Sequence, residues 1–193
     1  MAGRRAQRRE EGQARILEAA RALFDAAGVE GLSIRAIAAK AGMPTMSLYS
    51  YYPSKTALVR ALWSEAFAPL LAEMAAAEAA EPDPRARLLK VARTMVDYWL
   101  RFPDRYRIVF LIEDRRETES DTWFIDETDV VPGYMRFAPL IAAAKGDEGG
   151  DYLREGEALV CALTGIVHLL VTVSEYRWAP AQTYVETIVR GFC

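Results

Sequence analysis

SIRAIAAKAGMPTMSLYSYYPSK, residues 33–55, is the stretch that decides the fold. In its first half, Ile34, Ile37 and Ala41 fall on one face at helical spacing. Ser33 can cap this helix, because its hydroxyl can accept a hydrogen bond from a backbone N–H of the first turn. The stretch therefore begins with a short amphipathic helix.

A tight turn and a second short helix follow. Gly42 can adopt the positive φ that ends the first helix, and Pro44 can open the next one because its ring pre-sets φ. Leu48 and Tyr52 are four residues apart and are expected to face inward, and Pro53 stops the helix. The side chains left to face outward are Thr45, Met46, Ser47, Tyr49, Ser50 and Tyr51.

This order of helix, glycine turn and polar-aromatic helix is a helix-turn-helix, whose second helix fits the major groove of duplex DNA. Residues 12–65 also closely resemble the N-terminal signature of the tetracycline-repressor (TetR) family. The resemblance is carried by Ala41-Gly42, Leu48-Tyr49, Tyr51-Tyr52, Ser54-Lys55 and Leu58. It implies an all-α fold, with an N-terminal three-helix DNA-binding domain followed by a helical domain that binds an effector and dimerises.

The resemblance also implies roles for side chains of the helix-turn-helix. Those expected to face base edges are Thr45, Met46, Ser47 and Tyr51, and Met46 could lie against a thymine methyl group. Those expected to touch phosphates are Tyr49, Ser50 and Lys55, helped by Ser33 and Arg35; Pro44 completes the DNA-binding set. The alternative is that the tyrosines are core aromatics, which we expect for Tyr52 and in part for Tyr49.

Charge is distributed unevenly along the chain. The net charge of −3 combines residues 1–60, with ten basic and five acidic side chains, and residues 61–193, with 14 basic and 22 acidic ones. A basic head on an acidic body fits a head that meets phosphate. The alternative, a basic tail that serves only solubility, is less expected beside a helix-turn-helix.

The sequence predicts two domains, with a boundary near residue 60. Residues 1–60 form the DNA-binding domain, in which 1–11 is an arginine-rich arm expected to be flexible when free. This arm either lies along DNA or makes no defined contact. A helix over 12–27 carries a buried stripe and ends at Gly28.

Residues 61–193 read as a series of helices. A fourth helix starts at Ser54 and runs to about residue 80, where Pro69 could kink or split it. Residues 104–114 favour β structure locally, but no strand partner is evident, so we predict a helix. The remaining expectations are a helix from Arg85 to before Pro103, a loop or short broken helix over 115–132, a helix over 134–145 and a loop over 146–150.

The last two predicted helices are expected to form a homodimer interface. Residues 153–175 are nearly apolar all round, so this helix needs covering on both sides. The final helix, opened by Pro180, carries one apolar stripe, and two such helices from each of two chains would make a four-helix interface. The predicted interface residues are Leu163, Val167, Leu170, Tyr184, Val185, Ile188, Val189 and Phe192.

The resemblance implies a small effector bound between the helices of the body. Aromatic residues are frequent there, although most such residues simply fill a core. The predicted lining residues are Trp99, Phe102, Tyr106, Phe110, Phe137 and Thr164, with His168 as a polar anchor. This composition predicts an apolar or aromatic effector.

A catalytic or metal-dependent function is not predicted. His168 is the single histidine. The residues needed for a catalytic triad, a histidine metal cluster or a Cys–His dyad are therefore not all present. Acidic residues between Glu113 and Asp129 match no EF-hand spacing and read as a solvated loop. We therefore predict no enzyme activity, no metal and no cofactor.

Composition places the protein in the cytoplasm. The 52% of apolar and 26% of charged residues fit a soluble globular chain. Cys161 and Cys193 are few and far apart, which favours a reducing compartment, and Cys161 is expected to be inert. The apolar run 158–173 is interrupted and short for a membrane span, so no membrane association is predicted.

The sequence thus predicts a homodimeric, ligand-responsive transcriptional regulator, most simply a repressor that reads a palindromic operator. Two alternatives stay open. One is a sequence-tolerant architectural DNA-binding protein without an effector, and the other is a helical enzyme or carrier of small molecules.

Overall fold

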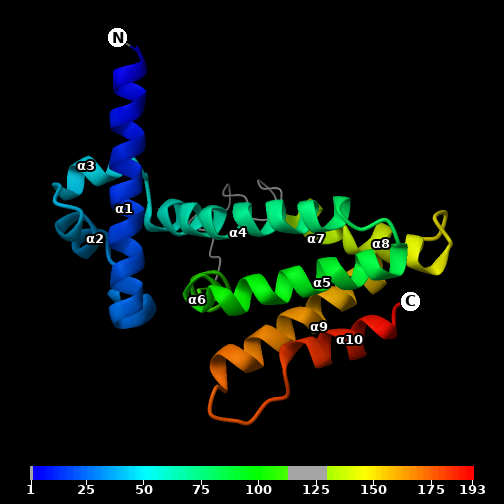
Figure 1. Ribbon diagram of the computed structural model, residues 1–193. Coiled ribbons are helices and arrows are strands. Elements are labelled where there is room, and N and C mark those ends of the chain that lie inside the picture. Colours follow the sequence, from blue (N-terminus) through cyan, green and yellow to red (C-terminus); the bar gives the residue numbers. More distant parts are fainter. Residues whose placement is uncertain (1, 113–129) are drawn as a thin grey trace. The chain divides into compact units, whose positions relative to one another are not determined.

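The computed structural model describes residues 2–112 and 130–193, and within these ranges every regular element is a helix (Figure 1). The predicted all-α fold is confirmed. The chain divides into two compact units. The head unit holds the described residues up to Ala66 together with the end of α6 (Pro103–Phe110) from Arg107 onward, and the body unit holds Phe67–Tyr106 and the described residues from Val130 to Cys193.

Three helices form the start of the head unit: α1 (Ala2–Gly31), α2 (Ile34–Lys40) and α3 (Thr45–Tyr49). In Figure 1, α2 and α3 lie beside the middle of α1. Ile16 and Ala20 of α1 are fully buried with Ile37 of α2 and Leu48 of α3. The head needs these apolar contacts, because α2 and α3 are too short to be stable helices on their own.

The first helix is longer than the sequence predicted. It extends back to Ala2, so residues 2–11 are helical, and Gln7 Nε2 donates to Glu11 Oε1 at 3.2 Å one turn later. The segment contains no proline, and arginine, glutamine and glutamate are good helix formers. At the other end the helix breaks where predicted, at Gly28, whose φ is 61°.

Helix α4 (Lys55–Ala79) belongs to both units, since the division falls between Ala66 and Phe67. Ser54 caps it: its Oγ accepts from the Ala57 N–H at 3.0 Å. Pro69 does not split the helix; its side chain is exposed, and the helix continues to Ala79. The division lies a little beyond the predicted boundary at residue 60.

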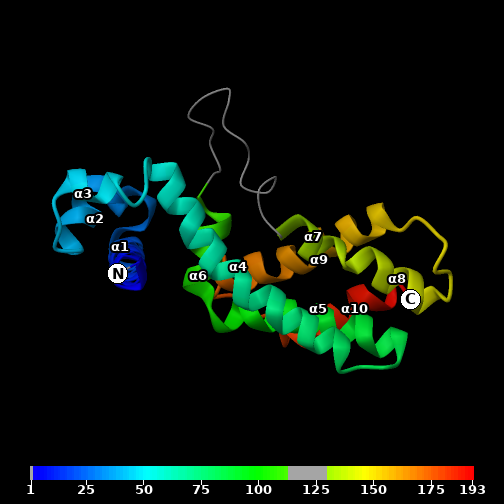
Figure 2. The same ribbon diagram turned by 90° about the horizontal axis from the view of Figure 1, so that it is seen from above.

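The body unit is built from α5 (Pro84–Arg101), α7 (Val130–Met135), α8 (Phe137–Lys145), α9 (Leu153–Thr172) and α10 (Ala181–Arg190). Helix α5 packs against α8, α9 and α10, and α9 and α10 lie side by side in Figures 1 and 2. Asp83 caps α5 by accepting from the Ala86 N–H at 2.8 Å, and Pro84 occupies its first turn. The helix expected over 134–145 is instead two, α7 and α8, with a turn at Arg136.

Aromatic side chains fill the centre of the body. Trp99, Tyr106 and Phe137 are among the largest fully buried side chains. The Trp99 ring meets Phe67 at 5.5 Å and Tyr106 at 5.9 Å between centroids, both edge-to-face. Such pairs favour fixed ring orientations. Residues 103–110 are helical (α6, Pro103–Phe110), as predicted for this β-favouring run.

Candidate functional site

The turn between α2 and α3 has the geometry that the sequence predicts. Ser33 Oγ accepts from the Ala36 N–H at 3.2 Å, which caps α2. Gly42 has φ 66°, a conformation that residues with a Cβ rarely adopt. Pro44 is the N-cap residue of α3 rather than its first residue. The two helices are therefore held at a fixed turn, as a helix-turn-helix requires.

Helix α3 has one face anchored in the head and another open to solvent. Leu48 is 0% exposed and Tyr52 is 7% exposed, so both face inward as predicted. Met46 is 78% exposed and Tyr49 is 44% exposed. Ser47, Ser50 and Pro44 are also exposed, and Thr45 is half-buried. Burial raises the pKa of the Tyr52 hydroxyl; Glu65 raises it further and Arg9 opposes the shift.

Tyr51 is the predicted DNA contact that the structure places differently from its neighbours. Its side chain is half-buried and lies over Gly12 of α1, where an added Cβ would come 2.5 Å from the tyrosine oxygen. The Arg9 guanidinium carbon lies 5.8 Å from the same ring centroid. The glycine and the arginine therefore hold Tyr51 against α1, an arrangement that nothing in the local spacing of residues 33–55 could indicate.

We expect Gly12→Ala to weaken operator binding by about tenfold, because the new Cβ displaces the Tyr51 ring from α1. Alanine favours a helix over glycine by about 1 kcal/mol, so the fold should persist. Fluorescence anisotropy with labelled operator measures the effect, and circular dichroism follows the fold. Gly3→Ala is the matched control, since no atom lies within 4 Å of its added Cβ. Equal affinities for the two variants would contradict the role given to Tyr51.

The remaining predicted phosphate contacts are available at the surface of the head. Arg35 and Lys55 are exposed, Lys55 being the first residue of α4. Ser33 is exposed, but its oxygen already accepts the capping hydrogen bond. Ser50 Oγ donates to the Ser47 carbonyl at 2.6 Å. Arg4, Arg8 and Arg9 add exposed positive charge along the first turns of α1.

The predicted effector residues are only partly brought together. Trp99, Tyr106 and Phe137 are buried in the body, and the Tyr106 ring lies 6.3 Å from His168. His168 itself is an exposed residue of α9. Phe110 belongs to the head unit. Phe102 lies under the Arg101 and Arg105 guanidinium groups, whose carbons are 4.8 and 4.4 Å from its ring centroid. Thr164 is half-buried.

Tyr134 belongs to this aromatic cluster but was not predicted. The centroid of its ring lies 5.8 Å from that of Phe67, and burial is the main cause that raises its hydroxyl pKa, while the nearby Trp99 indole opposes the shift. Burial also raises the pKa of Tyr106 to about 12. Tyr134 follows residues 113–129 closely in the sequence. That charged stretch, including the acidic side chains that were predicted to form a solvated loop, is outside the described residues. The apolar spacing of the sequence did not indicate that Tyr134 would pack against these core residues.

The raised pKa of Tyr106 predicts a loss of stability in alkali. Between pH 10 and 12 the unfolded chain releases this proton and the folded chain keeps it, so the free energy of unfolding falls as the pH rises through that window. In the Tyr106→Phe variant, the free energy of unfolding should decrease less with rising pH than it does in the unsubstituted protein. Urea unfolding at pH 9, 10.5 and 12 measures it, and Tyr176→Phe, at an exposed tyrosine, is the control. Equal slopes for both variants would contradict the prediction.

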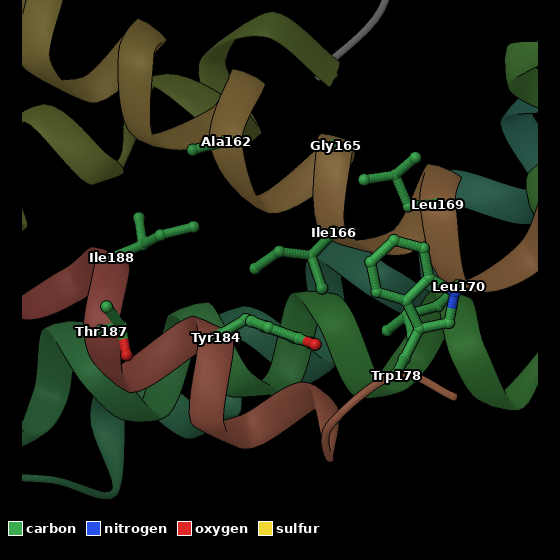
Figure 3. Close-up of a pocket in the computed structure, with 9 residues that line it drawn as sticks. All are labelled: Ala162, Gly165, Ile166, Leu169, Leu170, Trp178, Tyr184, Thr187 and Ile188. Atoms are coloured by element: carbon green, nitrogen blue, oxygen red, sulfur yellow. The ribbon is translucent and has the colours of Figure 1, made fainter. Parts of the chain in front are cut away.

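The predicted interface residues fall into two groups. Leu163, Val167, Val185 and Val189 are buried in the body itself, because α9 and α10 turn these side chains toward α5, so they are core residues. Leu170, Tyr184 and Ile188 instead line an apolar groove of about 290 Å³ between α9 and α10 (Figure 3). Ile166, Leu169 and Trp178 complete its apolar walls. Phe192 is half-buried after the end of α10.

Groups of three or more metal-ligating side chains do not occur among the described residues. Both cysteines are free and exposed. Cys161, which was expected to be inert, is an exposed residue of α9.

Known proteins match the chain over segments of very different length. Residues 16–62 match the family profile described as bacterial regulatory proteins, tetR family. The HTH-type transcriptional repressor DrrR1 of Streptomyces coeruleorubidus is 53% identical over 45 residues, which is 23% of this chain and 17% of that protein. The nucleoid occlusion factor SlmA of Haemophilus influenzae is 25% identical over 167 residues, which is 84% of this chain and 70% of that protein.

Solved structures share the fold over nearly the whole chain. A TetR-like transcriptional regulator from Rhodococcus sp. RHA1 has a TM-score of 0.69 at 22% identity, covering 95% of this chain and 94% of that one. The transcriptional regulator FadR from Bacillus subtilis, in complex with stearoyl-CoA, has a TM-score of 0.70 at 14% identity, covering 93% and 96%.

A helix-turn-helix head followed by an all-helical body is the architecture of many DNA-binding transcriptional regulators. Over residues 16–62 the chain matches the tetR family of bacterial regulatory proteins, and over nearly its whole length it shares the fold of a TetR-like structure.

Proposed function

We propose that the protein is a homodimeric repressor that binds a palindromic operator and leaves it when a small apolar or aromatic effector binds the body. One observation carries the proposal. Helix α3 is anchored by Leu48 and Tyr52, while Met46, Ser47 and Tyr49 stand free on its other face. A rigidly held helix with an open polar and apolar face is suited to the major groove.

Exposed apolar surface on α9 and α10 supports the dimer. Leu169 is 44% exposed, and the groove that it lines is almost entirely apolar. Helix α9 is long and apolar enough to cross a membrane by length and composition, with 22% of that window buried within the chain. A second copy would cover this face by pairing α9 and α10 with their equivalents, which gives the apolar helix a place in a cytoplasmic protein.

Two heads related by a two-fold axis would read two half-sites of an inverted repeat. Half-sites for such dimers lie about one helical turn of DNA, or a multiple of it, apart. Because both heads must be placed together, anything that changes their separation weakens binding to both half-sites at once.

The aromatic cluster of the body supports an effector site. Trp99, Tyr106 and Tyr134 place an indole N–H and two hydroxyls in an otherwise apolar interior. A few polar groups among aromatic walls are what orient a small apolar ligand. The effector must bind more tightly to the body state that disfavours DNA binding, or the equilibrium would not shift.

Two helices, α4 and α6, run from one unit into the other and would carry the signal. Within the head unit, the buried Trp63 Nε1–H donates to the Ile108 carbonyl at 2.8 Å, which ties α4 to the end of α6. A movement of α6 caused by the effector would therefore be passed to α4, the helix that directly follows the helix-turn-helix in the chain.

A second candidate function is favoured by the match to SlmA, which extends over 84% of this chain. In that case the protein would be a sequence-tolerant DNA-binding protein that acts without a small effector. Footprinting distinguishes the two: a repressor protects one palindrome, whereas a sequence-tolerant protein protects the DNA broadly.

Gel retardation with the DNA that flanks the protein's own gene tests the main proposal. We expect retardation that survives excess random competitor DNA and weakens as salt rises, because the head also contacts phosphates. Retardation that the competitor abolishes completely would contradict it.

A further inference from the structure

A second groove of the body unit has a chemistry that the proposed function does not use. It lies where α5 faces α10 and has a volume of about 380 Å³. Arg85, Leu89 and Arg93 line it from α5, and Glu186 and Arg190 line it from α10. Three guanidinium groups thus share one groove with one carboxylate side chain, and Ala86 and the free Cys193 complete its lining.

Only one of the three arginines is neutralised by this carboxylate. Arg93 Nη2 donates to Glu186 Oε1. The Nε atom of Arg93 is buried and, among the described residues, has no hydrogen-bond acceptor. A buried charged donor without an acceptor is costly, so the hydrogen-bonding capacity of the Arg93 guanidinium is not fully met by Glu186.

Arg85 and Arg190 leave further donors at the groove. The Nε–H of Arg85 donates to the Ala144 carbonyl at 3.2 Å, which fixes the position of the side chain and leaves its terminal nitrogens for a ligand. Arg190 is exposed in the last turn of α10. Planar guanidinium groups bind the paired oxygens of carboxylates and phosphates in a bidentate manner.

We propose that this groove is a binding site for a small organic anion, a carboxylate or a phosphate, whose charge is held by Arg85, Arg93 and Arg190. Leu89 and Ala86 give the groove an apolar floor on which the body of the ligand would lie. The site contacts neither helix of the helix-turn-helix and does not depend on the proposed function.

The groove also lies on a different side of α10 from the proposed dimer face. Tyr184, Thr187 and Ile188 line the apolar groove, whereas Glu186 and Arg190 line this one. An anion bound between Arg85 and Arg190 would join α5 to α10 and hold α10 in place. Ligand binding should therefore raise the thermal stability of the whole chain.

Titration with sodium phosphate and, separately, sodium butyrate, each at constant ionic strength, tests the proposal by calorimetry and by the shift in melting temperature. We expect saturable binding of at least one probe, with a matching rise in melting temperature. Tighter binding of butyrate would assign a carboxylate ligand, and tighter binding of phosphate would assign a phosphate ligand. No saturable binding of either probe would overturn the proposal.

Variants locate the site. Arg190→Gln and Arg85→Gln should each weaken binding of the preferred probe by about tenfold, the effect of losing one charged hydrogen-bonding group. Arg154→Gln is the matched control, because Arg154 is an exposed arginine of α9 that pairs with Glu157 and lies outside the groove. Equal weakening in all three variants, or in none, would overturn the proposal, since it would indicate nonspecific attraction or a different site.

Discussion

Leu169→Arg should convert the protein into a monomer and weaken operator binding by about 100-fold or more. Leu169 is exposed on α9 and lines the apolar groove beside α10. In the proposed dimer the new arginine would be buried without a partner, at a cost of about 3–5 kcal/mol. A monomer engages one half-site at a time, so it loses the gain from binding both together. Sedimentation velocity measures the mass, and anisotropy measures the affinity.

Val131→Arg is the matched control for this variant. Val131 is also an exposed apolar residue of the body, but it belongs to α7 and lies outside the groove. It should remain a dimer with unchanged affinity. A dimeric Leu169→Arg protein, or a monomeric Val131→Arg protein, would contradict the position given to the interface.

Ser47→Glu should abolish specific DNA binding while leaving the fold and the dimer intact. Ser47 is exposed on the open face of α3. A carboxylate about 4 Å from a phosphate is repelled by about 4 kcal/mol in the effective dielectric of a protein surface, and the dimer carries two such substitutions. We expect a loss of at least about 100-fold in affinity, measured by gel retardation.

Two controls accompany Ser47→Glu. Ser47→Ala removes the hydroxyl without adding charge and should cost at most about tenfold, the value of one hydrogen bond. Ala76→Glu adds the same charge at an exposed position of α4 in the body unit and should bind DNA as the unsubstituted protein does. Normal affinity of Ser47→Glu would show that α3 does not read DNA.

The helix-turn-helix could be predicted from the sequence because its signals are local. Ser33, Gly42 and Leu48 each fix one feature: a cap, a positive φ and a buried anchor. Each of these features depends on residues close to it in the sequence, so it can be predicted from the sequence alone. The same holds for the helix starts at Ser54 and Asp83, where a side-chain oxygen accepts a backbone hydrogen bond.

Features that depend on packing between distant segments could not be predicted in this way. Periodicity identified the apolar residues of α9. Only the packing of the helices shows that Leu163 faces the core and that Leu169 is exposed. The contact of Tyr51 with Gly12 joins the turn after α3 to α1, and Tyr134 reaches Phe67 across the body. The groove between Arg85 and Arg190 likewise forms only when α10 packs on α5.

The mass of the complex between the protein and its operator tests the central claim most directly. Sedimentation equilibrium of the purified protein with a duplex that contains the protected palindrome should give two chains per duplex, and a duplex with one half-site scrambled should bind far more weakly. A stable complex of one chain per duplex, with the same affinity for the intact and the scrambled palindrome, would contradict the claim that paired heads read the operator.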